Sequence, residues 1–68
     1  MRDVSGRELA RALERKGWTL LRVNGSHHVY GREDSGVRLT VPIHADQPLK
    51  MGLLHHLAKT AGLSEDDL

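Results

Sequence analysis

The chain has 68 residues, which is enough for one domain spanning 1–68 and leaves no room for a second. It contains no cysteine, so disulfides and cysteine-based zinc sites are excluded. Its formal net charge is +1, but three of the nine acidic residues are clustered at residues 65–67. The rest of the chain carries ten basic and six acidic residues, a net charge of +4. This composition is compatible with nucleic-acid binding and equally with a solvated, arginine-rich surface.

The sequence shows no sign of a membrane segment or a secretory signal. No stretch approaches the roughly 18 consecutive apolar residues that a membrane helix needs. Residues 1–5 (Met-Arg-Asp-Val-Ser) lack the apolar core of a signal peptide. We therefore expect a soluble, cytoplasmic protein.

The first predicted element is a helix that begins at Ser5. Residues 5–8 (Ser-Gly-Arg-Glu) have the Ser-x-x-Glu spacing of a capping box. Leu9, Ala12 and Leu13 follow at helical spacing and form a narrow apolar stripe. Gly17 is placed to end this helix in a left-handed conformation.

Three strands are predicted next. Residues 18–23 are rich in aromatic and branched side chains, and Asn24-Gly25 is a strong hairpin signal that predicts a primed turn with positive φ at both residues. Residues 27–32 form the returning strand, and residues 33–36 form a second turn. In residues 37–41, Val37, Leu39 and Val41 alternate with polar residues, which predicts one buried face, and Pro42 limits the strand.

A second amphipathic helix is predicted from Leu49 to Ala61, stopped by Gly62, with a short capped turn from Ser64. The order is therefore α-β-β-β-α. We predict an α+β fold with a three-stranded antiparallel sheet and both helices on one face, the layout of a double-stranded-RNA-binding-like domain.

Five histidines are the residues most able to carry chemistry: His27, His28, His44, His55 and His56. Neighbouring histidines on a strand point to opposite faces, and neighbouring histidines on a helix lie about 100° apart. None of the pairs has the i, i+4 spacing of a helical zinc site, so no metal site is predicted.

His27 follows the hairpin turn, where a side chain is firmly held yet exposed. An imidazole there suits proton transfer from a ribose 2′-OH, although a lone histidine at a strand end is more often structural than catalytic. Arg22, Arg32 and Lys50 are candidates for phosphate contacts. Tyr30 either stacks on a base or covers the core, and His44 is either a polar loop residue or part of the same surface.

Motifs along the whole chain resemble the HicA toxin family, also described as YcfA-like. In order they are Gly6-Arg7-Glu8-Leu9 to Lys16-Gly17-Trp18, Gly25-Ser26-His27-His28-Val29-Tyr30, Leu39-Thr40-Val41-Pro42-Ile43-His44, Leu49-Lys50-Met51-Gly52-Leu53-Leu54 and Ala61-Gly62-Leu63-Ser64. The order and spacing of several motifs make the resemblance more specific than any one of them.

The resemblance implies a messenger-RNA interferase of a toxin–antitoxin pair with a double-stranded-RNA-binding-like fold. It implies that His27 is the catalytic residue, presented by Gly25 and Ser26, with His28 as the second candidate. It also implies a HicB-type antitoxin as the protein partner.

We therefore predict a metal-independent endoribonuclease with no cofactor, in which His27 acts as acid or base and basic side chains neutralise the phosphate. Two alternatives remain: a non-catalytic RNA-binding module of the same fold, and a small protein-interaction domain. The sequence does not indicate a homo-oligomer.

Overall fold

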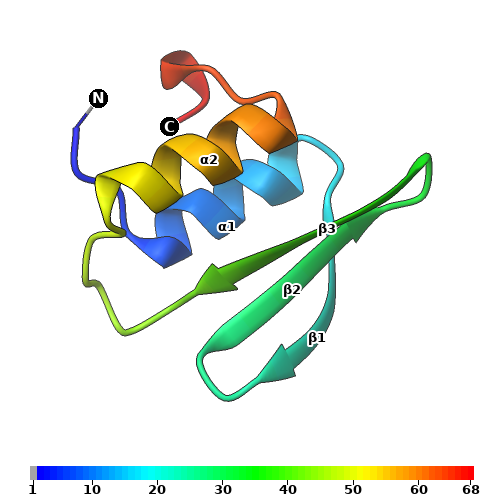
Figure 1. Cartoon of the computed structure of the whole chain (residues 1–68), viewed down its shortest axis with the longest axis horizontal. Helices are drawn as coiled ribbons and strands as arrows, with labels where there is room; N and C mark the ends of the chain where they lie inside the picture. Colours follow the sequence, from blue (N-terminus) through cyan, green and yellow to red (C-terminus); the bar gives the residue numbers. More distant parts are fainter. Residues whose placement is uncertain (1) are drawn as a thin grey trace.

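The computed structural model describes residues 2–68 as two helices on a three-stranded antiparallel sheet (Figure 1). The elements are α1 (Gly6–Arg15), β1 (Thr19–Asn24), β2 (His27–Arg32), β3 (Ser35–Pro42), α2 (Met51–Ala61) and a short 3₁₀ helix, η1 (Glu65–Asp67). The predicted α+β class and the α-β-β-β-α order are confirmed. Within residues 2–68, none of the helices has the length and apolar character needed to cross a membrane.

Helix α1 begins where the sequence predicts. The Ser5 hydroxyl accepts a hydrogen bond from the Glu8 backbone at 3.1 Å, and the Glu8 carboxylate accepts one from the Ser5 backbone at 3.2 Å. This reciprocal capping box satisfies two backbone donors that would otherwise lack partners. After the helix, Gly17 has a φ of +93°, as expected for a residue that turns the chain out of a helix.

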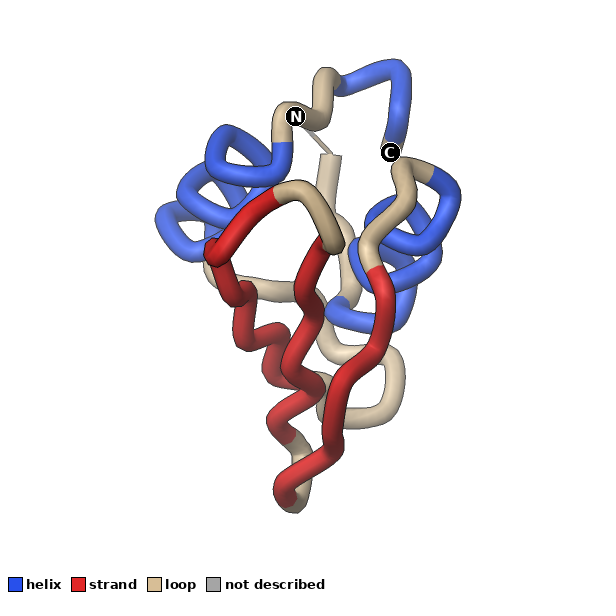
Figure 2. The backbone as a smooth tube through the Cα atoms, turned by 90° about the vertical axis from the view of Figure 1, so that its right-hand side faces the viewer, coloured by secondary structure: helices blue, strands red, loops and turns tan. Residues whose placement is uncertain are grey.

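The sheet has the order β1-β2-β3, so β2 is central. Strand pairing places His28, Tyr30, Leu39 and Val41 on the face that carries the helices, called the helix face below. His27, Val29 and Gly31 lie on the opposite, open face. The turn between β1 and β2 lies at the end of the sheet remote from both helices (Figure 2).

The core lies between the helix face and the two helices and is almost wholly aliphatic. Its most deeply buried side chains are Val4, Leu9, Leu13, Val41 and Leu54. Trp18 and Tyr30, the aromatic residues of the chain, complete this cluster with 4% and 2% of their surface exposed. Burial of aliphatic side chains from both helices and two strands therefore holds the sheet against the helices.

The first hairpin turn lies one residue later than predicted. Asn24 pairs with His27, so the two central residues are Gly25 and Ser26. Gly25 has a φ of +63°, and among the described non-glycine residues only Ala45 has a positive φ. Glycine at the first central position suits a turn with positive φ there alone, so the prediction of positive φ at Asn24 and Gly25 is wrong.

Other element boundaries also differ from the sequence prediction. Strand β1 begins at Thr19, after the buried Trp18, and β3 begins at Ser35, inside the predicted second turn. Helix α2 begins at Met51, because Lys50 is still extended, with a ψ of 139°, and Leu49 donates its backbone N–H to the Val4 carbonyl at 2.8 Å. Leu49 is buried, so it belongs to the core without belonging to the helix.

Two apolar surfaces are exposed. Val37 is 42% exposed, because the β2–β3 hairpin extends beyond the helices, so the prediction that it is buried is wrong. All six residues of β1 are exposed, including Leu20, Leu21 and Val23 at 40%, 50% and 53%. An edge strand with three exposed aliphatic residues is an uncommon feature in an isolated domain.

Candidate functional site

The Gly25-Ser26 turn is held against the loop that leaves β3. The Ser26 carbonyl accepts a hydrogen bond from the Ile43 backbone at 2.8 Å. This bond continues the β2–β3 pairing one step beyond His27 and Pro42. The turn that carries the Gly25-Ser26-His27 motif and the loop that follows β3 are therefore joined at one end of the sheet.

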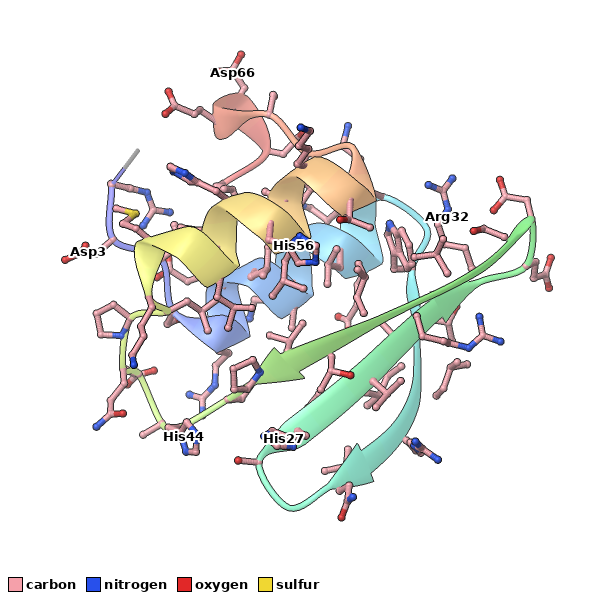
Figure 3. All side chains as sticks on the ribbon, in the orientation of Figure 1. Asp3, His27, Arg32, His44, His56 and Asp66 are labelled. Atoms are coloured by element: carbon pink, nitrogen blue, oxygen red, sulfur yellow. The ribbon has the colours of Figure 1, made fainter. Side chains whose placement is uncertain are left out.

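This contact brings two histidines from different motifs to the same end of the molecule. His27 and His44 are both exposed, and Figure 3 shows them at the end of the sheet remote from the helices. The Ser26 hydroxyl oxygen lies 3.5 Å from His44 Nε2. Of the two readings that the sequence left open for His44, the structure therefore favours a place beside the turn.

The backbone after His44 has an unusual conformation. Ala45 has a φ of +52°, in the left-handed region that alanine rarely adopts. The next turn is closed by a hydrogen bond from the Gln47 backbone to the His44 carbonyl at 3.0 Å. The loop around His44 thus has a defined shape, which is typical of segments that place a functional side chain.

The histidine doublet is divided between the two faces of the sheet. His27 pairs with Asn24 and Pro42 and lies on the open face. His28 pairs with Val23 and Val41 and lies half-buried on the helix face. The two imidazoles therefore occupy different surroundings, and they cannot serve one site in the same way.

His28 borders a hollow between the sheet and α1. The hollow has a volume of about 390 Å³ and is lined by Arg7, Ala10, Arg11, Glu14, Leu20, His28, Tyr30 and Ile43. Two arginines and one glutamate make its rim mainly basic. This hollow is the natural site for RNA if His28, the second candidate, carries the chemistry.

A second hollow lies on the open face, on the side of His27. It has a volume of about 360 Å³ and is lined by Leu21, Arg22, Val29, Arg38 and Thr40. Arg38 also borders a neighbouring hollow of about 410 Å³ that reaches Arg32 near the β2–β3 turn. Sequence reasoning selected Arg22 but missed Arg38, although its alternation with Leu39 places it on the open face.

Comparison with known proteins identifies the family. The family model described as the HicA toxin of bacterial toxin–antitoxin systems matches residues 6–63, which include every element from α1 to α2. The chain belongs to the HicA toxin family. No curated protein matches it. HicA toxins are RNase-type toxins that generally cleave messenger RNA, and they act in pairs with an antitoxin.

In this HicA toxin, Tyr30 is part of the core. Only 2% of its surface is exposed, and its hydroxyl donates a hydrogen bond to the Glu14 carboxylate at 3.1 Å. Burial, then this hydrogen bond and the charge of Glu14, raises the pKa of Tyr30 to about 12. A ring enclosed in this way cannot stack on a base, so its position argues against the predicted RNA contact.

The remaining predicted phosphate contacts of the toxin are spread over the molecule. Arg32 is at the far end of β2, where its guanidinium lies 5.3 Å from the centre of the Trp18 ring and 3.4 Å from Asp34 (Figure 3). Lys50 is exposed at the N-terminus of α2, at the end of the loop that carries His44. The structure therefore does not bring Arg32 together with His27.

The described part of the toxin, residues 2–68, contains no group of three or more histidine, aspartate or glutamate side chains arranged to hold a metal ion. The His44 imidazole lies beside the hydroxyl of the serine in the turn. The arrangement offers imidazoles for proton transfer and guanidinium groups for binding anions.

Proposed function

We propose that this HicA toxin is an endoribonuclease that cuts messenger RNA by metal-independent acid–base catalysis at His27 and thereby inhibits translation. The observation that carries the proposal is the position of His27. Its imidazole is exposed, while its backbone is paired on both sides with Asn24 and Pro42. A side chain that is exposed to a ligand, and whose backbone is held in place by its neighbours, has the properties that acid–base catalysis requires.

RNA cleavage suits so small a site because the substrate supplies its own nucleophile. The ribose 2′-OH attacks the adjacent phosphorus, and His27 takes the proton from that hydroxyl. The protein then has only to hold the phosphodiester, move protons and offset the charge that develops on the phosphoryl oxygens. Guanidinium groups provide the last of these without a metal ion.

The basic hollow on the open face is the RNA-binding surface in this proposal. Arg22 and Arg38 line it on either side of Val29. Val29 lies two residues along β2 from His27 on the same face, a distance of roughly 7 Å. A single strand that occupies the hollow therefore leads a phosphate towards His27, and a longer strand extends towards Arg32.

The central experiment incubates purified toxin with a labelled messenger RNA in EDTA. It compares the unaltered protein with His27→Ala, His28→Ala and His56→Ala. His56 is an exposed histidine on α2, away from His27, and controls for the loss of an imidazole as such (Figure 3). We expect cleavage by the unaltered protein and by His56→Ala, and none by His27→Ala.

Other outcomes separate the alternatives. Loss of cleavage only in His28→Ala would move the chemistry to the hollow beside α1. Full cleavage by folded His27→Ala would contradict the proposed residue. RNA binding without cleavage by the folded, unaltered protein would favour the non-catalytic RNA-binding module.

The RNA-binding surface has its own test, which is the salt dependence of binding. Each phosphate contact to single-stranded RNA contributes about 0.7 to the slope of log K against log salt concentration. Replacing Arg22 or Arg38 with Ala should lower that slope by about this amount. Arg15→Ala is the control, because Arg15 lies in α1 and donates to the Asp67 carbonyl at 3.0 Å, so its slope should be unchanged.

We further propose that the antitoxin partner is of the HicB type and that it covers the His27 end of the toxin in the cytoplasm. The exposed aliphatic residues of β1 support a protein partner, because they leave apolar surface in water in the free domain. In the complex obtained by co-expression with the antitoxin, the backbone amide hydrogens of β1 should exchange with solvent more slowly than in the free toxin. Unchanged exchange in β1 in a complex that still blocks cleavage would place the interface elsewhere.

A further inference from the structure

The loop after β3 places a second imidazole beside the turn that presents His27. His44 lies 18 residues from Ser26 in the sequence, yet its Nε2 is 3.5 Å from the Ser26 hydroxyl. The Ser26–Ile43 backbone hydrogen bond lies next to this contact in the chain, and the left-handed Ala45 directly follows His44. His44 is therefore held at the site by its backbone, while its side chain remains exposed.

Cleavage of an RNA strand needs two proton transfers at different oxygen atoms. One proton leaves the 2′-OH as it attacks phosphorus, and another must reach the 5′-oxygen as its bond to phosphorus breaks. These oxygens lie on opposite sides of the phosphorus in an in-line displacement, so two groups perform the transfers more readily than one. His27 provides only one of the two groups.

We propose that His44 is the general acid of the site and that it protonates the 5′-oxygen leaving group; this assignment rests on the proposed endoribonuclease function. The bond from the 2′-oxygen to phosphorus forms and the bond from phosphorus to the 5′-oxygen breaks. His27 gains the proton of the 2′-OH, and His44 gives its proton to the 5′-oxygen. The products are a 2′,3′-cyclic phosphate and a 5′-hydroxyl, and proton exchange with water restores both imidazoles.

The geometry around Nε2 suits this role. A separation of 3.5 Å is long for a hydrogen bond, so the serine orients the imidazole while Nε2 remains available to a substrate atom. Contacts of catalytic groups are often long in the free enzyme and tighten only with substrate. A leaving oxygen that enters beside Ser26 can therefore take the proton from Nε2.

The charged groups near His44 are a balanced pair. Asp46, two residues along the loop, lies 3.4 Å from the Arg7 guanidinium of α1. The carboxylate is thus offset by an arginine, and the other titratable groups at or near this end of the sheet include His27, His28 and Lys50. Loss of the His44 imidazole therefore removes a proton donor without leaving an unpaired buried charge, because the site is exposed.

The test uses two RNA substrates that differ in one atom. In one, the leaving 5′-oxygen is replaced by sulfur. A thiol has a pKa near 8.5, so a thiolate leaves without being protonated, whereas an alkoxide does not. Cleavage of both substrates is measured for the unaltered toxin, His44→Ala, His27→Ala and the control His56→Ala, with thermal unfolding of each to verify the fold.

We expect His44→Ala to cleave the oxygen substrate about 100-fold or more slowly, the usual range for loss of a general acid. The same variant should cleave the sulfur substrate within a few-fold of the unaltered protein. His27→Ala should cleave neither substrate, and His56→Ala should cleave both.

An equal slowing of both substrates in His44→Ala would show a binding or structural role and overturn the assignment. Unchanged cleavage of both would exclude His44 from the chemistry, while the proposed function would stand. If the folded, unaltered protein cleaves neither substrate, the proposed function fails and this assignment fails with it.

Discussion

Replacing Gly25 with alanine tests the conformation of the turn that presents His27. Gly25 has a φ of +63°, and a Cβ built there would meet no atom within 4 Å. Steric contacts therefore neither add to nor offset the backbone preference. An alanine in the left-handed region costs about 1–2 kcal/mol. A domain of this size has a free energy of unfolding of about 3–10 kcal/mol, so the change is easily measured.

The assay is urea unfolding followed by circular dichroism, with thermal unfolding as a second measure. We expect Gly25→Ala to lower the urea midpoint at an unchanged slope, and to lower Tm by about 4–16 °C. Gly25→Asn should cost less, because asparagine adopts the left-handed conformation more readily.

Gly52→Ala is the matched control. A Cβ at Gly52 also meets open space, but the residue lies in the first turn of α2, where alanine is favoured by up to about 1 kcal/mol. The two substitutions add the same methyl group and should change stability in opposite directions. A Gly25→Ala protein as stable as the unaltered one would refute the positive φ at this turn.

Three further changes probe the core. The pKa of Tyr30, raised to about 12, lets the folded state keep a proton that the unfolded chain loses near pH 10. The free energy of unfolding should therefore be steady below about pH 10 and fall between about pH 10 and 12. Tyr30→Phe should lessen that fall. Urea midpoints of the unaltered protein that are identical at every pH would contradict this prediction. Leu54→Ala should cost about 3–5 kcal/mol in urea unfolding because the side chain is fully buried, and a loss below 1 kcal/mol would contradict the packing. Gly6→Ala places a methyl group against the Pro42 carbonyl, so calorimetry should show a lower Tm than for the unaltered protein, and an equal Tm would argue against this close approach.

Local signals in the sequence predicted the elements well. The capping box at Ser5 and the glycine after α1 act through contacts within a few residues, so the sequence alone contains the relevant information. The first hairpin was displaced by one residue because two neighbouring pairs, Asn24-Gly25 and Gly25-Ser26, can both close a tight turn. The positive φ that the turn requires falls on Gly25 in either case.

Periodicity predicted which face a side chain occupies but not whether that face is covered. Leu39 and Val41 lie on the helix face and are buried, whereas Val37, which alternates with them in the sequence, is exposed. Coverage depends on how far the β2–β3 hairpin extends past α1 and α2, which is a property of the assembled fold (Figure 1). The same limit explains the exposed aliphatic residues of β1, which occupies the edge of the sheet.

For the candidate site, the sequence supplied the Gly-Ser-His turn but not its neighbours. The contact between Ser26 and His44 depends on the length of β3 and on the left-handed Ala45, neither of which a motif reveals. The alternation of Arg38 with Leu39 already placed Arg38 on the exposed face of the strand, but the folded sheet was needed to show that it lines one hollow with Arg22. Tyr30 is not part of the candidate site, because it lies buried on the helix face.

The fold separates the groups that stabilise it from the groups proposed to cut RNA. The core lies against the helix face, while His27, at the start of β2, and His44, in the loop after β3, lie at the end of the sheet remote from the helices. Replacing either imidazole removes few buried contacts, so activity can be lost while the free energy of unfolding is almost unchanged. Substitutions such as Leu54→Ala should do the reverse, reducing cleavage only through the folded fraction. An antitoxin that binds only the folded toxin would raise the stability of core variants by mass action.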